Sequence, residues 1–438
     1  CEPLVRYRPD GRVEAMLATT WATADSRVWT LTLREGVSFH DGAPLDADAV
    51  VANLESLRRA RLFAGRAERL GPLVVSITLD KPNAALLATL SQPVFTLQSP
   101  RELAAPRGRL VGTGAFRLAS SHPGEVHLEA YPGYWGSPPR LGGVIFRRLA
   151  GEESLVAALL SGAVQATTAI GQAQVARLRQ SRDIVLDAET GLNVAFLSMN
   201  NERPPFNDPR VRQALARAVD RPALVENILA GHGEPARNPL PPSLLGYAPR
   251  TKELILDRQG ARRLLAQAGF PEGFETTLLT ADAPRPYLPA PVHLAEQIRH
   301  DLEAVGIRAR LTPTASWAEY LERAARGDYD LAVLGWIADT PDPNDFLSAL
   351  LASESVGATN RSRYRSAEMD ALLKRGRRGH SAADRADTYQ EAQALFQRDM
   401  PWIPLYHVAV FTAYRRSVHG LAAGPTGVLR YDKAWIAR

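Results

Sequence analysis

The chain has 438 residues, of which 45% are hydrophobic and 23% are charged, with a formal net charge of +5 and a pI near 9.4. That length exceeds one ordinary domain, so two or three domains are expected. Arginines and acidic residues alternate along the chain, which argues against a nucleic-acid partner despite the basic pI. No apolar run approaches the ~20 residues of a membrane-spanning helix, so no direct membrane span is expected.

Cys1 is the only cysteine. A single thiol excludes an intramolecular disulfide, a zinc cluster built on cysteines and a Cys-x-x-Cys redox site. A mature lipoprotein also begins with cysteine, but it usually has a flexible tether, whereas folded-looking sequence follows Cys1 directly. We therefore expect an ordinary residue at a trimmed end, with lipidation as the alternative.

The first 150 residues predict mostly short strands. Residues 29–33 alternate apolar and polar side chains as a half-buried strand does. Residues 46–57 predict a helix with acidic residues in its first turn, where they favour the helix dipole. Further strands are expected at residues 74–79, 115–118, 126–129 and 144–149.

The middle of the chain becomes more helical. Helices are expected at residues 154–160 and 172–179, followed by a strand at 194–199. A third helix is expected at 209–218, because Asp208 can cap it and Pro209 suits its first turn. Residues 222–229 predict a continuation of that helix.

Residues 275–336 alternate strand and helix. Strands at 276–279, 307–311 and 329–336 are separated by an amphipathic helix ending near residue 305 and a helix at 317–325. This β-α-β-α-β order predicts an α/β fold with parallel strands and right-handed crossovers. Ligands of such sheets bind beyond the carboxyl ends of the strands.

Two opposite charges follow carboxyl ends of these strands. Arg285 lies after the first strand and Asp339 after the third, so both loops are expected at one sheet edge. An arginine matches a carboxylate and an aspartate suits an ammonium, so the pair could clasp a zwitterion. Trp336 and Tyr287 would add apolar walls with polar tips. Plain surface charges or a mutual salt bridge remain alternatives.

Catalytic and metal-binding signatures are missing from the sequence. No G-x-S-x-G, H-E-x-x-H or P-loop pattern occurs, and no pair of histidines has helical metal-ligand spacing. We expect no enzymatic activity, no cofactor and no metal. His407 follows a short apolar strand and is a candidate cleft residue, although a satisfied structural histidine is the more ordinary interpretation.

The chain resembles the peptide/nickel class of extracytoplasmic solute-binding proteins that serve ABC importers, closest to its dipeptide-binding members. The stretches that carry the resemblance occur in family order over essentially the whole chain. They are EPLVRYRPDGRVEAMLATTWATADSRVWTLTLREGVSFHDGAPLDADAV, VGTGAFRL, YPGYWG, VAALLSGAV, LSMNNERPPFNDPRVRQALARAVDRPAL, GWIADTPDPNDF and PWIPLYH.

The resemblance implies two lobes joined by a hinge, plus an extra domain specific to the class. The first lobe would comprise residues 1–15, 108–198 and 408–438, without the N-terminal strand usual in the family. The extra domain would be 16–107 and the second lobe 199–407. Ligand would bind in the cleft between the lobes, and the protein would be a monomer in the periplasm or at the cell surface.

The resemblance also assigns roles at the site. Asp339, after Gly335-Trp336, would bind the α-ammonium of a peptide, and Arg285, in the RPYLP loop, its carboxylate. Asp342 and Asp345 would be loop and helix-start residues. The implied ligand is a short peptide, most simply a dipeptide, and the implied partner is an ABC permease. Alternatives are an oligopeptide, opine, sugar or nickel-chelate binder, a peptide hydrolase, or a sensory domain. Ala130 replaces an arginine of several nickel binders, which argues against a metal chelate.

Overall fold

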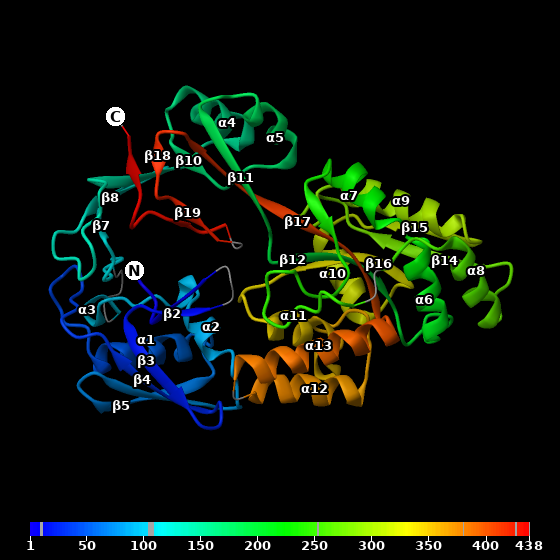
Figure 1. The fold of residues 1–438 in the computed structure, drawn as a ribbon, viewed down its shortest axis with the longest axis horizontal. Coiled ribbons are helices and arrows are strands. Elements are labelled where there is room, and N and C mark those ends of the chain that lie inside the picture. Colours follow the sequence, from blue (N-terminus) through cyan, green and yellow to red (C-terminus); the bar gives the residue numbers. More distant parts are fainter. Residues whose placement is uncertain (9–11, 104–108, 252–253, 380, 425–426, 438) are drawn as a thin grey trace. The chain divides into compact units, whose positions relative to one another are not determined.

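A computed structural model describes residues 1–8, 12–103, 109–251, 254–379, 381–424 and 427–437. The chain divides into two compact units. Unit 1 contains residues 1–189, 377–380 and 410–438, and unit 2 contains residues 190–376 and 381–409. Both units contain helices and strands (Figure 1), and strand β17, Trp402–Arg415, begins in unit 2 and continues into unit 1, where β10 and β11 pair with it.

Unit 1 contains several small sheets. A four-stranded antiparallel sheet has the order β3-β4-β6-β5, and helix α1 packs against β5 and β6. A three-stranded antiparallel sheet has the order β7-β8-β9. The strands are β1 Val5–Tyr7, β2 Val13–Ala15, β3 Ala18–Thr23, β4 Val28–Leu33, β5 Gly65–Gly71, β6 Val74–Leu79, β7 Phe116–His122, β8 Glu125–Ala130, β9 Gly143–Arg147, β10 Ala166–Thr167, β11 Ile184–Thr190, β18 Val418–His419, β19 Ala422–Ala423, β20 Leu429–Arg430 and β21 Trp435–Ile436. The helices are α1 Ala47–Arg59, α2 Leu86–Leu90, α3 Pro100–Leu103, α4 Gly151–Ser161 and α5 Gln172–Arg179, with a 3-10 turn at Pro93–Phe95.

The YPGYWG segment, residues 131–136, has a structural role in unit 1. The carboxylate of Glu2, which is buried, accepts hydrogen bonds from Thr113, Tyr134 and Trp135, each at 2.9 Å. Burial and the neighbouring Glu2 charge raise the pKa of Tyr134, so its hydroxyl remains a donor. These three neutral donors allow a carboxylate to be buried, since a buried polar group is costly unless it is hydrogen-bonded.

Unit 2 is built around one mixed sheet with the order β17-β12-β16-β14-β15, with β13 added on β17. Strand β14 is parallel to β15 and β16, whereas β12 is antiparallel to β16 and β17. Its strands are β12 Asn193–Met199, β13 Gly233–Pro235, β14 Phe274–Thr280, β15 Ile307–Pro313, β16 Leu331–Ile337 and β17 Trp402–Arg415. Every residue of β12 is buried, so β12 is the centre of the core.

Helices cover the sheet of unit 2. Helix α9 packs on β14, β15 and β16, and Phe396 of α13 lies against Trp402 of β17, with ring centroids 4.6 Å apart. In Figure 1 the orange helices α12 and α13 and the green helix α6 belong to this unit. The helices are α6 Pro209–Ala218, α7 Arg221–Leu229, α8 Arg258–Gln267, α9 Pro291–Glu303, α10 Trp317–Arg326, α11 Pro343–Leu351, α12 Ala367–Arg378 and α13 Ala382–Asp399, with a 3-10 turn at Ser353–Ser355.

Local sequence signals set the ends of these helices. Ser316 accepts from the backbone N–H of Glu319 at the start of α10, and Glu319 accepts in return from Ala315. This arrangement resembles a capping box, except that Glu319 reaches the residue before the N-cap. Helix α10 ends at Gly327, whose φ of +72° suits a left-handed cap.

The α/β class and the parallel β-α-β-α-β region are confirmed, with element ends shifted by a few residues. Two details differ from expectation. Helices α6 and α7 are separate, because Asp220 caps a new helix. The strand around His407 is not short but runs over Trp402–Arg415. The proposed boundary at 107/108 and the terminal Arg438 lie outside the described residues, and the three-part domain division stays a prediction.

Candidate functional site

The parallel strands bring two loops to one edge of the unit 2 sheet. Leu278 and Leu279 of β14 pair with Leu331 and Ala332 of β16, so both strands end at the same side. Strand β14 stops at Thr280, whereas β16 continues to Ile337. The loop after β14 therefore lies alongside the last residues of β16.

Arg285 is held in a tight turn of that loop. The backbones of Arg285 and Leu288 exchange two hydrogen bonds of 2.9 Å. The guanidinium of Arg285 lies 4.2 Å from the ring centre of Trp317, and its Nη1 donates to the carbonyl of Pro284 at 3.0 Å. No carboxylate pairs with Arg285 among the residues that the structure describes. Its charge is thus positioned by an aromatic face and left without an ionic partner.

Trp317 is itself fixed. Its ring stacks on Tyr320, with centroids 5.1 Å apart and planes 12° apart. The hydroxyl of Tyr320 is buried and donates to the carbonyl of Val333 in β16. We name Trp317 and Tyr320 the aromatic shelf. The shelf connects Arg285 to the middle of β16. Because an aromatic side chain has only two rotatable χ angles and its ring is held by stacking, the shelf restricts where the guanidinium of Arg285 can lie.

Tyr287 fixes the same loop to the end of β16. A Cβ added at Gly335 would lie 2.1 Å from Cδ2 of Tyr287, so the tyrosine ring rests on the bare backbone of Gly335. Burial raises the pKa of Tyr287, which keeps its hydroxyl neutral. The glycine before Trp336 is therefore required by the approach of Tyr287.

Trp336 marks the point where β16 leaves the core. Residues 331–334 are buried, Trp336 is half-buried and Ile337 is exposed. The indole Nε1 of Trp336 is buried without a hydrogen-bond partner in the part of the chain that the structure describes. Most buried donors are satisfied, so this N–H is available to a ligand acceptor or a water molecule.

The three aspartates after β16 have different environments. Asp342 caps α11 and forms a buried ion pair with Arg385 at 2.7 Å. Asp345 accepts from the backbone N–H of Thr340 at 2.6 Å, and burial raises its pKa. Asp339 is exposed, and within the described residues its carboxylate has no hydrogen bond or ion pair. Asp339 alone of the three is therefore open to a ligand charge.

His407 lies in a different setting. It is buried in β17, and its Nδ1 lies 2.6 Å from the carbonyl of Asn193. Burial lowers its pKa, so the ring is neutral, Nδ1–H donates to Asn193, and Nε2 is left as an acceptor without a partner among the described residues. No described contact joins His407 to Arg285 or Asp339.

Tyr406 was not singled out from the sequence. It pairs with Ala195 of β12, which in turn pairs with Gly335 of β16. Directly opposed residues share a face of a sheet, so Tyr406 lies in the same row as Gly335, on which Tyr287 rests. Its hydroxyl is buried without a partner in the described structure. Since successive side chains alternate, His407 points to the opposite face of β17.

Trp317 and Tyr320 were also missed by sequence reasoning. They belong to an amphipathic helix, in which aromatic residues ordinarily indicate core packing. Only the approach of the Arg285 loop brings them to the candidate site. The PWIPLYH segment did contain a signal for Tyr406. Tyr406 and His407 are neighbours in one strand, so their side chains face opposite sides of the sheet, and either one could have faced the candidate site.

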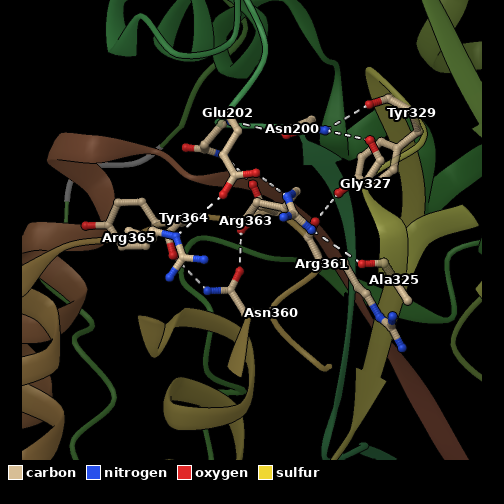
Figure 2. Close-up of polar contacts among 12 residues, drawn as sticks. Asn200, Glu202, Ala325, Gly327, Tyr329, Asn360, Arg361, Arg363, Tyr364 and Arg365 are labelled. Carbon is tan, nitrogen blue, oxygen red and sulfur yellow. Dashed lines mark hydrogen bonds and ion pairs between the residues drawn. The ribbon is translucent and has the colours of Figure 1, made fainter. Parts of the chain in front are cut away.

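A second polar cluster lies at the other end of β16. Figure 2 shows Glu202 between Arg363 and Arg365, and Asn200 donating to the carbonyls of Gly327 and Tyr329. The hydrogen bond from Arg363, followed by that from Arg365, lowers the pKa of Glu202. These contacts fix residues 360–365 to the start of β16, which is a structural role.

Metal-binding and membrane-spanning features are not found in the described residues. No group of three or more His, Cys, Asp or Glu side chains there has the arrangement of a metal site. Among the helices that the structure describes, none combines the length and the apolar character needed to cross a bilayer.

Comparisons with known proteins identify relatives over almost the whole chain. The family model described as "Bacterial extracellular solute-binding proteins, family 5 Middle" matches residues 12–358. Heme-binding protein A of Haemophilus influenzae is 29% identical, covering 95% of this chain and 82% of the relative. The dipeptide-binding protein of Escherichia coli K12 is 28% identical, with coverages of 96% and 85%. Glutathione-binding protein GsiB of Salmonella paratyphi A is 30% identical, with coverages of 97% and 86%.

Solved structures give the same result. The structure of HbpA2 from Haemophilus parasuis has a TM-score of 0.94 and 27% identity, covering 100% of this chain and 94% of that one. A dipeptide-binding protein of Pseudoalteromonas sp. SM9913 in complex with Met-Leu has a TM-score of 0.76 and 26% identity, with the same coverages. The fold is therefore the two-lobed fold of periplasmic binding proteins, as the family resemblance implied.

Proposed function

The chain belongs to family 5 of the bacterial extracellular solute-binding proteins, and from this membership we propose that it captures short peptides, chiefly dipeptides, and delivers them to an ABC permease. Proteins of this family are non-enzymatic binders that act outside the cytoplasm and supply ABC transporters with peptides and related ligands. A permease partner follows from the family. The dipeptide, its contacts and the monomeric state are our proposals.

The observation that carries the proposal is the pair of charges without ionic partners at one sheet edge. Asp339 would accept the α-ammonium of the peptide, and Arg285 would pair with its terminal carboxylate. Arg285 lies on the aromatic shelf, and Tyr287 ties its loop to the strand that leads to Asp339. A charged peptide terminus loses water when it is bound, so each terminus needs a compensating charge.

Trp336, Tyr287 and Tyr406 would line the space between the two charges. The buried N–H of Trp336 and the buried hydroxyl of Tyr406 have no partners among the described residues and could bind the peptide backbone or ordered water. His407 remains a candidate ligand contact through its free Nε2, although its side chain is on the other face of β17.

The named ligands of relatives support a peptide over other solutes. One relative is a dipeptide-binding protein, and one structural neighbour holds Met-Leu. Others are named for glutathione, itself a tripeptide with two free carboxylates, and for heme. Glutathione is therefore the second candidate, and heme, a nickel chelate and sugars are the comparison ligands.

The test is titration calorimetry with Met-Leu, its N-acetylated form, its C-amidated form, Met-Leu-Met and glutathione. We expect Met-Leu to bind best and each blocked form to bind at least ~100-fold more weakly, because a buried unpaired charge costs roughly 3–5 kcal/mol. Asp339→Asn should abolish the discrimination against N-acetylation, and Arg285→Gln the discrimination against C-amidation.

Matched controls are Glu303→Gln and Arg310→Gln, which remove exposed charges on α9 and β15 of the same unit. Both should bind Met-Leu like the wild type. Equal binding of free and blocked peptides would refute the two-ended clasp while leaving the transporter family intact. Preferential binding of glutathione would establish the second candidate.

A further inference from the structure

The loop that carries Asp339 is anchored on both sides of that residue. Before it, the backbone N–H of Ala338 donates to the carbonyl of Leu192 at 2.9 Å. After it, the backbone N–H of Thr340 donates to the carboxylate of Asp345 at 2.6 Å, and the hydroxyl of Thr340 donates to the same oxygen at 3.3 Å. Asp339 therefore lies between two fixed peptide groups, of which the second is fixed by a side chain.

Asp345 does not follow the usual pattern for an acid at its position. It is the third residue of α11, and Asp342 is the N-cap of that helix. An acid at the third helical position commonly accepts from the backbone N–H of the cap residue. The carboxylate of Asp345 instead reaches Thr340, two residues before the cap. Its side chain therefore ties the loop to the helix.

The helix to which the loop is tied is itself fixed. Asp342 at its start forms the buried ion pair with Arg385, and Phe346 and Leu347 of its first turns are fully buried. The first turn of a helix also favours a negative charge through the helix dipole. Asp345 is thus a firmly mounted acceptor for the loop.

The carboxyl groups of Asp339 and Asp345 are close enough to influence each other. Asp345 is half-buried and its pKa is raised, first by burial and further by the charge of Asp339, while the hydrogen bond from Thr340 opposes the rise. Neighbouring carboxylates disfavour each other's ionised form, and a nearby cation relieves that cost. Among the described residues no arginine or lysine pairs with either carboxylate. The arrangement therefore favours a ligand that brings a positive charge.

We propose that Asp345 is a positioning residue for the ammonium group of the ligand, because it holds the Thr340 peptide so that the carboxylate of Asp339 stays directed at the ligand. Its own charge adds to that of Asp339. The inference rests on the proposed function, since it requires an ammonium at Asp339. Asp345 does not itself contact the ligand, because its carboxylate is half-buried and engaged by Thr340. A ligand with a blocked N-terminus gains nothing from Asp345.

The first test measures the anchor in the ligand-free protein by hydrogen exchange. The amide hydrogen of Thr340 should exchange at least ~10-fold faster in Asp345→Ala than in the wild type, because its acceptor is removed. Asp345→Asn keeps an acceptor oxygen and should preserve most of the protection. Amides of β14 and β16 should exchange alike in all three proteins, which shows that the variants are folded.

The second test compares Met-Leu with its N-acetylated form by calorimetry, using displacement for the weaker ligand. Asp345→Ala should bind Met-Leu ~10-fold more weakly, while its affinity for the N-acetylated peptide should change by less than ~2-fold. Asp345→Asn should recover most of the affinity for Met-Leu, because the loop is held again. A residue that only stabilised the fold would weaken the binding of both peptides alike.

The matched control is Asp384→Ala. Asp384 occupies the same third position in α13, after the N-cap Ser381, and its side chain is exposed. Its removal should leave both peptide affinities and the exchange of the Thr340 amide unchanged.

Three outcomes would overturn the proposal. Unchanged exchange of the Thr340 amide in Asp345→Ala would mean that the carboxylate does not hold the loop. Wild-type affinity of Asp345→Ala for Met-Leu would exclude a positioning role, and so would an equal loss of affinity for both peptides. Failure of the proposed function is a different result, in which the wild-type protein itself binds free and N-acetylated Met-Leu equally, and it would remove the basis of this inference as well.

Discussion

The two ends of strand β16 have opposite electrostatic arrangements. At its start, Glu202 bridges Arg363 and Arg365, and Arg203 lies 3.4 Å from Asp330. Near its carboxyl end, where the loop after β14 lies alongside it, Arg285 and Asp339 have no ionic partners among the described residues, and no ion pair joins them to each other. Both ends are rich in charge, so charge alone does not distinguish them.

The difference gives a criterion that separates structural charges from candidate binding charges. A charge that is already paired has its solvation replaced within the protein, and a ligand would have to break that pair. A charge that is positioned but unpaired can exchange water for a ligand at lower cost. The aromatic shelf holds Arg285 without neutralising it, because a cation–π contact does not use up its hydrogen-bond donors.

The largest expected effect contrasts two aspartates of the same loop. Asp342→Asn would keep the Oδ1 that caps α11 and accepts from Arg385, but would remove the negative charge that compensates the buried guanidinium, so we expect a loss of about 3–5 kcal/mol in the free energy of unfolding. Asp339→Asn should change it by no more than about 0.5 kcal/mol. Urea unfolding of the ligand-free proteins measures both. Similar losses of unfolding free energy in the two variants would contradict the distinction between a paired Asp342 and an unpaired Asp339.

The next effect concerns the contact between the loop and β16. Gly335→Ala places a methyl group against the ring of Tyr287, so it should destabilise the protein by about 1–3 kcal/mol and weaken Met-Leu binding. Adding Tyr287→Ala should recover stability, because it removes the atoms that clash. A Gly335→Ala variant as stable as the wild type would show that Tyr287 can leave the strand at little cost.

A smaller effect tests the aromatic shelf. Trp317→Leu removes the ring beneath Arg285, and we expect Met-Leu to bind about 2–5-fold more weakly, which corresponds to about 0.5–1 kcal/mol. C-amidated Met-Leu should bind both proteins equally, since it does not need Arg285. Calorimetry with the two peptides separates this positioning role from a general loss of folding. An equal loss of affinity for both peptides would count against a positioning role of Trp317.

The smallest effect is at the paired end of β16. The pKa of Glu202 is lowered by Arg363 and Arg365, so its stabilisation is present above the unfolded pKa of about 4.3 and is lost as pH falls through the lower folded value. Glu202→Gln should cost up to about 1 kcal/mol at pH 7, and the difference from wild type should shrink below about pH 4. Met-Leu affinity should not change. Thermal unfolding at several pH values is the measurement.

Sequence reasoning was most accurate where the signals are local. The helix at 209–218 was predicted at its observed bounds, because an aspartate cap and a first-turn proline act within a few residues. The parallel strands were predicted from the order of alternating elements. The separation of α6 and α7 was missed, although Asp220 is itself a local cap, because the apolar pattern seemed to continue.

The sequence by itself determined the α/β architecture, the family and the two loops in which Arg285 and Asp339 lie. Periodicity, caps and chain order suffice for the architecture and the loops, since each depends on neighbours in the chain, whereas the family follows from the motifs that resemble it. Only the tertiary structure decided which of the three aspartates lacks a partner among the described residues, that Trp317 lies against Arg285, and that Tyr406 shares a row with Gly335. Those features depend on contacts such as Asp342 with Arg385 and Arg285 with Trp317, which bring together residues 43 and 32 positions apart.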